Sequence, residues 1–188
     1  MRKIILFQNV SLDGYFEGVN HDLSWSVHDY EAFETRDRNA PAGTLLFGHR
    51  TYDLMKEYWP TDEAKQMAPD LSKYMNETLK VVVSRKGFEP GWENVRVIAG
   101  DIVSGIKLLK EEPGGDFMIF GSNELVVSLM QANLIDEFQI VVNPVAIGNG
   151  TSLFAGLKQR MNLLLVGTRQ FKSGAVMLTY QPSDQKTL

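Results

Sequence analysis

The segment from Thr44 to Tyr52, with the sequence TLLFGHRTY, gives the clearest indication of the fold class of this chain. Its first four residues form a short apolar run that ends at a glycine, which is typical of a strand buried in a sheet. Gly48 then begins a helix, because the apolar residues that follow recur at helical spacing. A strand that passes directly into a helix is the repeating unit of α/β proteins.

Two further segments repeat this transition. Residues 95–98 form a short strand before a helix capped by Asp101, and residues 117–120 form a strand that passes through Gly121-Ser122 into a helix. Another apolar strand covers residues 79–84. We therefore predict an α/β fold around a central, mixed sheet whose strands are mostly parallel.

The last third of the sequence has a different pattern. Residues 135–142, 163–166 and 175–180 are strands without helices between them, and the last two are joined through Lys172-Ser173-Gly174. Consecutive strands of this kind pair in antiparallel fashion. We expect an antiparallel C-terminal hairpin at one edge of the sheet.

The N-terminal part adds one strand and a long loop. Residues 4–7 are apolar and too few for a helix, residues 11–27 are loop-like and rich in aromatic residues, and residues 28–38 fit an amphipathic helix. The sequence contains neither an internal repeat nor a linker. We expect a single domain over residues 1–188, with residues 183–188 frayed.

Composition excludes several classes of partner. The formal net charge is −4, so no basic field exists to hold a nucleic acid. The first apolar run stops at Gln8, far short of a membrane span or a signal segment. Cysteine is absent, which removes disulfides and Cys-ligated metal sites. We expect a cytoplasmic protein that binds neither nucleic acid nor membrane.

The common catalytic motifs are also absent. His21, His28 and His49 lie far apart, so no metal site is expected. The sequence has no Gly-x-Ser-x-Gly elbow, no phosphate-binding P-loop and no Gly-x-Gly-x-x-Gly fingerprint. Serine hydrolases, P-loop enzymes and ordinary Rossmann sites are excluded on this ground.

Three junctions at strand ends carry chemistry suited to anions. Residues 48–51 place a glycine, a histidine, an arginine and a threonine at a helix start, Ser84-Arg85 ends another strand, and Gly121-Ser122-Asn123 begins a third helix. Helix N-termini and basic side chains bind phosphate. The simpler alternative at each junction is a glycine turn or helix cap with solvated side chains.

Five motifs, in this order along nearly the whole chain, resemble the dihydrofolate reductase superfamily. They are Ser11-Leu12-Asp13-Gly14-Tyr15, residues 46–52, Val82-Val83-Ser84-Arg85, residues 119–125 and residues 143–148. Within it the chain is most similar to the C-terminal reductase domain of the bifunctional riboflavin-biosynthesis deaminase-reductase, especially at residues 134–137. The resemblance implies a dihydrofolate reductase-like three-layer fold with NADPH across the strand ends.

The resemblance also implies roles for individual residues. The cofactor would be bound by Gly48, His49, Arg50, Thr51, Ser84, Arg85, Gly121, Ser122, Asn123, Glu124 and Leu125. Ser84 and Arg85 would hold the adenosine end with its 2′-phosphate, so NADPH is expected to bind more tightly than NADH. The substrate would be bound by Asp13, Gly14, Trp25 and Gly148.

The resemblance implies hydride transfer to a heterocyclic or ribosylaminopyrimidine-type substrate, as in 5-amino-6-(5-phosphoribosylamino)uracil reductase. Asp13 is the first candidate for the proton donor, bound water the second, and an Asp-Gly turn is the simpler alternative for this residue. Glu17 and Asp29 are further candidates.

Two other functions stay open. A dihydrofolate or pterin reductase would need an acid on the first helix, where Asp29, Glu31 and Glu34 are candidates, and a non-catalytic NADP(H)-binding protein would need none. Residues 138–142 and 163–166 are more apolar than one sheet edge requires, so we expect a homodimer through this end.

Overall fold

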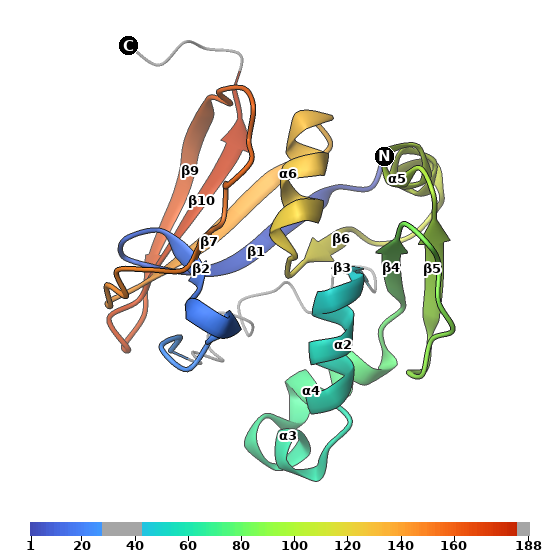
Figure 1. Cartoon of the computed structure of the whole chain (residues 1–188), viewed down its shortest axis with the longest axis horizontal. Helices are drawn as coiled ribbons and strands as arrows, with labels where there is room; N and C mark the ends of the chain where they lie inside the picture. The colour runs from blue at the N-terminus through green and yellow to red at the C-terminus, as the bar shows by residue number, and fades with distance from the viewer. Residues whose placement is uncertain (28–42, 184–188) are drawn as a thin grey trace.

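The computed structural model describes residues 1–27 and 43–183, and within them eight strands form one sheet in the order β5-β4-β3-β6-β1-β7-β10-β9 (Figure 1). The strands are β1 (Ile4–Ser11), β2 (Tyr15–Glu17), β3 (Thr44–Gly48), β4 (Lys80–Ser84), β5 (Val95–Ala99), β6 (Phe117–Ile119), β7 (Glu137–Asn143), β8 (Thr151–Ser152), β9 (Leu163–Gln170) and β10 (Val176–Pro182). The helices are η1 (Val19–His21), α2 (His49–Tyr58), α3 (Asp62–Met67), α4 (Pro69–Glu77), α5 (Ile102–Glu111) and α6 (Asn123–Gln131).

The pairing of the strands confirms the predicted mixed sheet. Strand β1 pairs in parallel with β6 and β7, and β3 pairs in parallel with β6 and β4. Strand β10 pairs antiparallel with both β7 and β9, so the C-terminal hairpin lies at one edge. The fold is therefore α/β, mostly parallel, with an antiparallel C-terminal end.

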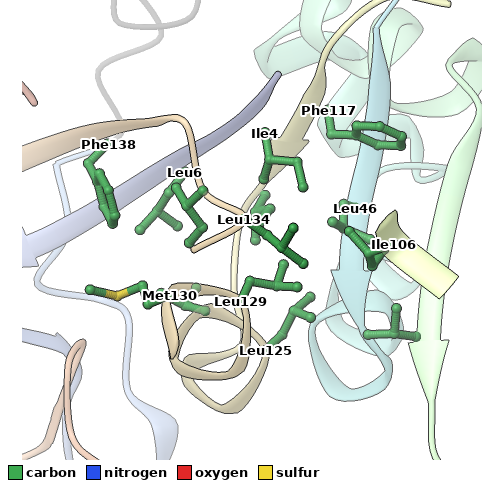
Figure 2. Close-up of a cluster of buried hydrophobic side chains, with 14 of the residues drawn as sticks. Ile4, Leu6, Leu46, Ile106, Phe117, Leu125, Leu129, Met130, Leu134 and Phe138 are labelled. Atoms are coloured by element: carbon green, nitrogen blue, oxygen red, sulfur yellow. The ribbon is translucent and has the colours of Figure 1, made fainter. Parts of the chain in front are cut away.

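Alternating side chains of the central strands build a core on each face of the sheet. On one face, side chains of β1, β3, β6 and β7 pack against α5 and α6, as Figure 2 shows for Leu6, Leu46, Leu129 and Met130. On the other face, Phe47 packs with Tyr52 of α2 and with residues of α4. Helices on both faces of the sheet give the three layers that the resemblance implies.

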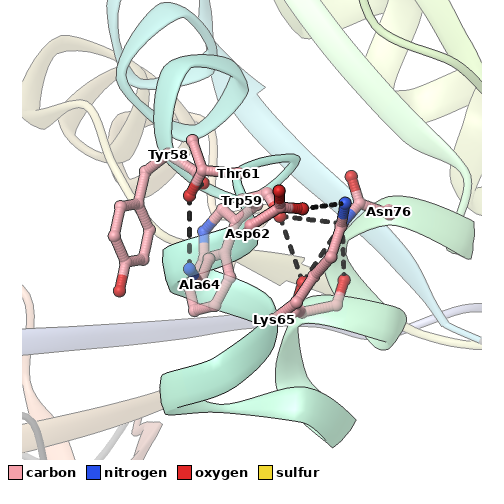
Figure 3. A network of polar contacts seen from close by, with 8 residues as sticks. Tyr58, Trp59, Thr61, Asp62, Ala64, Lys65 and Asn76 are labelled. Atoms are coloured by element: carbon pink, nitrogen blue, oxygen red, sulfur yellow. Dashed lines mark hydrogen bonds and ion pairs between the residues drawn. The ribbon is translucent and has the colours of Figure 1, made fainter.

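The connection from α2 to α4 is fixed by polar contacts. Thr61 accepts a hydrogen bond from the Ala64 backbone N–H at 3.2 Å and so caps α3. The side-chain amide of Asn76 in α4 donates to the Trp59 carbonyl at 3.0 Å, just after the end of α2 (Figure 3). These bonds hold α2 and α4 together on the face of the sheet where Phe47 is buried.

Several sequence predictions need correction. Strand β1 continues to Ser11, four residues beyond the predicted end, because β7 pairs with it along its whole second half. Part of the predicted loop over residues 11–27 is β2, which pairs with the unpredicted two-residue strand β8. Neither strand is long enough to show a periodic pattern. The helix expected over residues 28–38, and most of the tail expected to fray, lie outside the described residues.

Candidate functional site

The parallel strands place the predicted junctions at one edge of the sheet. The carboxyl ends of β3, β4 and β6 are Gly48, Ser84 and Ile119, and these strands are neighbours or separated by one strand. Strand β1 pairs with β6 only as far as Leu6, although β1 itself continues to Ser11. The sheet therefore opens between β1 and β6, which is where ligands bind in open α/β sheets.

Two glycines let β3 and β6 approach each other at this opening. The Gly48 N–H donates to the Gly121 carbonyl at 3.3 Å, and a Cβ on Gly48 would lie 2.7 Å from Ser122 Oγ. Gly121 has a φ of 115°, which strains any other residue, and a Cβ there would lie 3.3 Å from Thr51 Oγ1. The two helix starts at His49 and Asn123 therefore lie side by side.

The basic residues at the start of α2 already have partners. Arg50 Nη2 lies 3.1 Å from Glu17 Oε2, and its side chain is half exposed. The His49 ring stacks on Phe88 with 4.0 Å between the ring centroids, and its Nε2 lies 3.6 Å from an Asp53 carboxylate oxygen. An anion at this helix start would therefore meet arginine and histidine side chains held in place by neighbours.

The other predicted cofactor residues differ in what they can contribute. Arg85 is largely exposed and lies 3.3 Å from Glu124, which follows the start of α6. The Asn123 side-chain amide donates to three carbonyls of residues 152–155, so it fastens the β8 segment to α6. Leu125 is buried in the hydrophobic core, so its side chain contributes packing.

Asp13 is an exposed carboxylate with several hydrogen-bond donors. It accepts from Ser11 Oγ at 2.6 Å, from the Gly148 N–H at 2.7 Å and from the Ile147 N–H at 3.2 Å. The Ser11 hydroxyl, followed by the Gly148 N–H, lowers the pKa of Asp13 below its ordinary value. Asp13 is thus ionised at neutral pH, and its hydrogen bond with Gly148 brings two of the predicted substrate-binding residues together.

The predicted substrate residues Gly14 and Trp25 lie on the same loop. Gly14 donates its backbone N–H to the Ser11 carbonyl at 2.9 Å, and the Trp25 indole N–H donates to the Asp22 carbonyl at 3.0 Å. The end of this loop is fixed by Asn143, whose Oδ1 accepts from the Val27 N–H at 2.9 Å. The buried Asn143 therefore determines where the loop leaves the sheet.

Glu17 is the main site residue whose setting the sequence did not reveal. Its carboxylate is almost fully buried and contacts Arg50 and His21, each at 3.1 Å, and accepts from Thr151 Oγ1 at 2.8 Å. It joins the first loop to α2 and to β8. Because β8 has only two residues, no sequence pattern pointed to this arrangement.

The residues at this edge fit a dinucleotide cofactor. Gly121 lies close to polar side-chain atoms, because a Cβ there would lie 3.3 Å from Thr51 Oγ1 and 3.6 Å from Gln8 Oε1. Gln8 Oε1 is a buried acceptor with no hydrogen-bond partner in the described part of the chain. A tight glycine turn beside helix starts suits phosphate, and an unmet acceptor suits a ligand N–H.

The described residues contain neither a metal-binding cluster nor a membrane-spanning helix. In residues 1–27 and 43–183, histidine, aspartate and glutamate side chains do not gather in groups of three that could hold a metal ion. Among the helices described, none is long and apolar enough to cross a membrane.

Comparison with known proteins identifies the family. Residues 2–177 match the family model described as the RibD C-terminal domain. The chain belongs to this family. Protein YyaP of Bacillus subtilis (strain 168), itself uncharacterized, is 35% identical over 180 residues, covering 95% of this chain and 94% of YyaP. The predicted resemblance is confirmed, and membership of this reductase-domain family favours an oxidoreductase.

Solved structures confirm the dihydrofolate reductase-like fold. A pyrimidine reductase-like protein from Corynebacterium diphtheriae is 12% identical, with a TM-score of 0.71 over 98% of this chain and 93% of that one. Dihydrofolate reductase from Enterococcus faecalis, complexed with NADP(H), is 14% identical, with a TM-score of 0.63 over 97% of each chain. The Thermotoga maritima diaminohydroxyphosphoribosylaminopyrimidine deaminase/5-amino-6-(5-phosphoribosylamino)uracil reductase is 18% identical, with a TM-score of 0.68 over 97% of this chain and 57% of that one.

Proposed function

We propose that this protein is an NADPH-dependent reductase that transfers a hydride to a heterocyclic substrate of the ribosylaminopyrimidine type. The observation that carries the proposal is the paired start of α2 and α6 at the opening between β1 and β6, with Asp13 on the loop that follows β1. Phosphate-binding geometry and an exposed carboxylate therefore lie at one edge of the sheet. Membership of the RibD C-terminal domain family supports the same reaction.

Each group of residues has a distinct part in this proposal. The backbone of residues 48–51 and 121–123 binds the phosphates of the cofactor, with Arg50 beside them. Ser84 and Arg85 bind the adenosine end, where Arg85 offers a charged contact to a 2′-phosphate. When bound, NADPH supplies the hydride, and the protein contributes orientation and exclusion of water.

Asp13 has the geometry of a carboxylate that positions a hydrogen-bond donor. Its lowered pKa and its contacts with Ile147 and Gly148 keep it ionised and fixed near the predicted substrate. A fixed carboxylate can bind an N–H of a heterocycle or orient a water molecule that delivers the proton. The proton that accompanies the hydride then reaches the substrate nitrogen or oxygen from that water.

The experiment that tests this function begins with the wild-type protein. Titration with NADPH and with NADH measures cofactor binding, and we expect tighter binding of NADPH. Turnover is then followed as loss of NADPH absorbance with 5-amino-6-(5-phosphoribosylamino)uracil and, separately, with dihydrofolate. Turnover of dihydrofolate alone would favour the pterin reductase, whose candidate acids Asp29, Glu31 and Glu34 lie outside the described residues. Binding without turnover of any substrate would favour the non-catalytic protein.

We also propose that the protein is a homodimer through the β9 edge. Leu164, Leu165 and Val166 are about half exposed on this edge strand. The expectation that residues 138–142 also need a partner is wrong in part, because Phe138, Ile140 and Val141 are buried within the chain's own core. Exposed apolar edges are usually covered in native proteins. Light scattering should give twice the monomer mass, and Leu165→Glu should return the monomer.

A further inference from the structure

Gln8 is a polar residue on an otherwise apolar face of β1. Leu6 and Val10, two residues before and after it, are buried in the core that packs on α6. The Gln8 side-chain amide makes one long hydrogen bond, from Nε2 to the Asn9 carbonyl at 3.4 Å. Its Oε1 is buried without a partner among the described residues. A buried acceptor left unsatisfied costs free energy, so a native structure retains one only for a reason.

The position of this oxygen suggests the reason. A Cβ placed on Gly121 would lie 3.6 Å from Gln8 Oε1 and 3.3 Å from Thr51 Oγ1, so the amide oxygen lies directly beside the Gly121 turn to which the proposed function assigns the cofactor. The pairing of β1 with β6 ends at Leu6 and Ile119, two residues before Gln8 on β1. Gln8 therefore stands where the two strands separate, at the opening assigned to the ligand.

We propose that Gln8 is a specificity-determining residue whose Oε1 accepts a hydrogen bond from a bound ligand's carboxamide or ring-amine N–H. This inference rests on the proposed function. The donor can come from two sources, the carboxamide of the nicotinamide ring or an amino group of the heterocyclic substrate. Both satisfy the same acceptor, and the experiment separates them.

The test compares two ligands that differ only in the nicotinamide part. NADPH contains it, whereas 2′-phospho-ADP-ribose lacks it but keeps the phosphates and adenosine. The ratio of their dissociation constants isolates what the ring contributes and cancels general effects of a mutation on the phosphate sites. We measure this ratio by calorimetry for the wild type, Gln8→Met, Gln8→Glu and the control Gln139→Met, and the melting temperature without ligand for each.

The two Gln8 variants distinguish three roles of this side chain: hydrogen-bond acceptor, hydrogen-bond donor and purely structural residue. Met matches the length of Gln without a polar atom, and Glu keeps an acceptor but loses the amide donor. We expect Gln8→Met to melt at or above the wild-type temperature, because it removes an unmet polar atom, while its ligand ratio falls at least tenfold. Gln8→Glu should keep most of the ratio. Gln139 bonds to Glu137 on β7, so Gln139→Met should leave the ratio unchanged.

Each result decides the proposal. An unchanged ratio in Gln8→Met, together with a tenfold rise in KM for the pyrimidine substrate, supports the proposal with the substrate as donor. An unchanged ratio and an unchanged KM overturn it, as does an equal loss of the ratio in Gln8→Glu, which would make Gln8 a donor. If Gln8→Met does not fold, Gln8→Leu, which also lacks a polar atom, takes its place and decides on the same terms. Failure of the wild type to bind NADPH would instead contradict the proposed function itself.

Discussion

Polar side chains are hydrogen-bonded differently at the two ends of the parallel strands. At the amino ends, Lys80 donates to the carbonyls of Asn76 and Thr78 at 2.8 and 2.7 Å and lies over the Trp92 ring. Lys110 likewise donates to the Leu134 carbonyl and to Asp136. These buried cations use their hydrogen-bonding capacity within the chain.

At the carboxyl ends one buried polar atom lacks a partner and two charged side chains are accessible to solvent. Gln8 Oε1 has no partner in the described residues, Asp13 is exposed, and half of the Arg50 side chain is accessible. Buried polar groups that are fully hydrogen-bonded stabilise a fold. Buried polar groups without a hydrogen-bond partner cost stability, and proteins retain them where they bind a ligand. We therefore expect mutations at the amino ends to affect stability and mutations at the carboxyl ends to affect binding and turnover.

The largest effect is expected from Asp13→Asn. This change keeps the size of the side chain but removes the charge and one acceptor oxygen, so the carboxylate that orients the proton-delivering water is lost. Turnover should fall by roughly 10²–10⁴, the range for a group that assists proton transfer. The melting temperature should change by only a few degrees, since the side chain is exposed. Steady-state kinetics and thermal unfolding measure the two quantities.

The matched control for this change is Asp116→Asn. Asp116 is also an exposed carboxylate outside the helices and strands and accepts from the Lys3 N–H at 2.7 Å, but it precedes β6 at the amino ends of the parallel strands. It should leave turnover unchanged. Equal turnover in Asp13→Asn and the wild type would make Asp13 a turn residue.

The second effect concerns the amino ends. Asp136→Ala removes the carboxylate that pairs with the buried Lys110 and accepts from the Ile4 N–H. Leaving that cation unpaired should lower the free energy of unfolding by roughly 2–3 kcal/mol. Urea unfolding measures the loss, and NADPH affinity should stay as in the wild type. The exposed pair of Asp62 with Lys65 is the control, and Asp62→Ala should cost less than about 1 kcal/mol. A changed NADPH affinity in Asp136→Ala would break the division between the two ends.

The sequence correctly predicted the strands that have long apolar runs and the strand-to-helix junctions that contain a glycine. The apolar run 44–47 and the transition at Gly121 are local signals, so both could be read without the structure. The contacts of Glu17 with Arg50 and Thr151 join segments far apart in the chain, and no local pattern encodes such distances. Asn123 was expected to bind cofactor, yet its side chain is occupied by three carbonyls of the β8 segment. The sequence therefore indicated where the site lies better than what each side chain does there.

The third effect concerns Arg85, which follows the carboxyl end of β4. If Arg85 meets the 2′-phosphate, Arg85→Ala should weaken NADPH about tenfold and leave NADH nearly unchanged, since one charge-assisted hydrogen bond is lost. Breaking its exposed contact with Glu124 should itself cost little stability. Arg96→Ala is the control, because Arg96 also pairs with a glutamate but on the outer strand β5. Parallel weakening of NADPH and NADH would move the 2′-phosphate away from Arg85.

The smallest effect is a dependence of stability on pH at the amino ends. Burial lowers the pKa of Lys80 to about 8, against an ordinary value of 10.5. Below pH 8 the folded and unfolded states both hold the proton, so the cost of burying the charge is fully present. Between the two pKa values the folded state releases its proton while the unfolded state keeps it, so stability rises with pH in this window.

Lys80→Met removes the titrating amine, so stability should rise less with pH in this variant. From about pH 7 to about pH 9.5 the melting temperature of the wild type should rise by a few degrees relative to that of Lys80→Met. The comparison between the two proteins cancels groups that titrate in both. NADPH affinity should be equal in the two at either pH, because Lys80 begins β4 at the amino ends of the strands, whereas the cofactor is proposed to bind at their carboxyl ends. Identical curves would show that Lys80 keeps its proton up to its ordinary pKa, and a pH-dependent difference in NADPH affinity would show that the amino ends also influence binding.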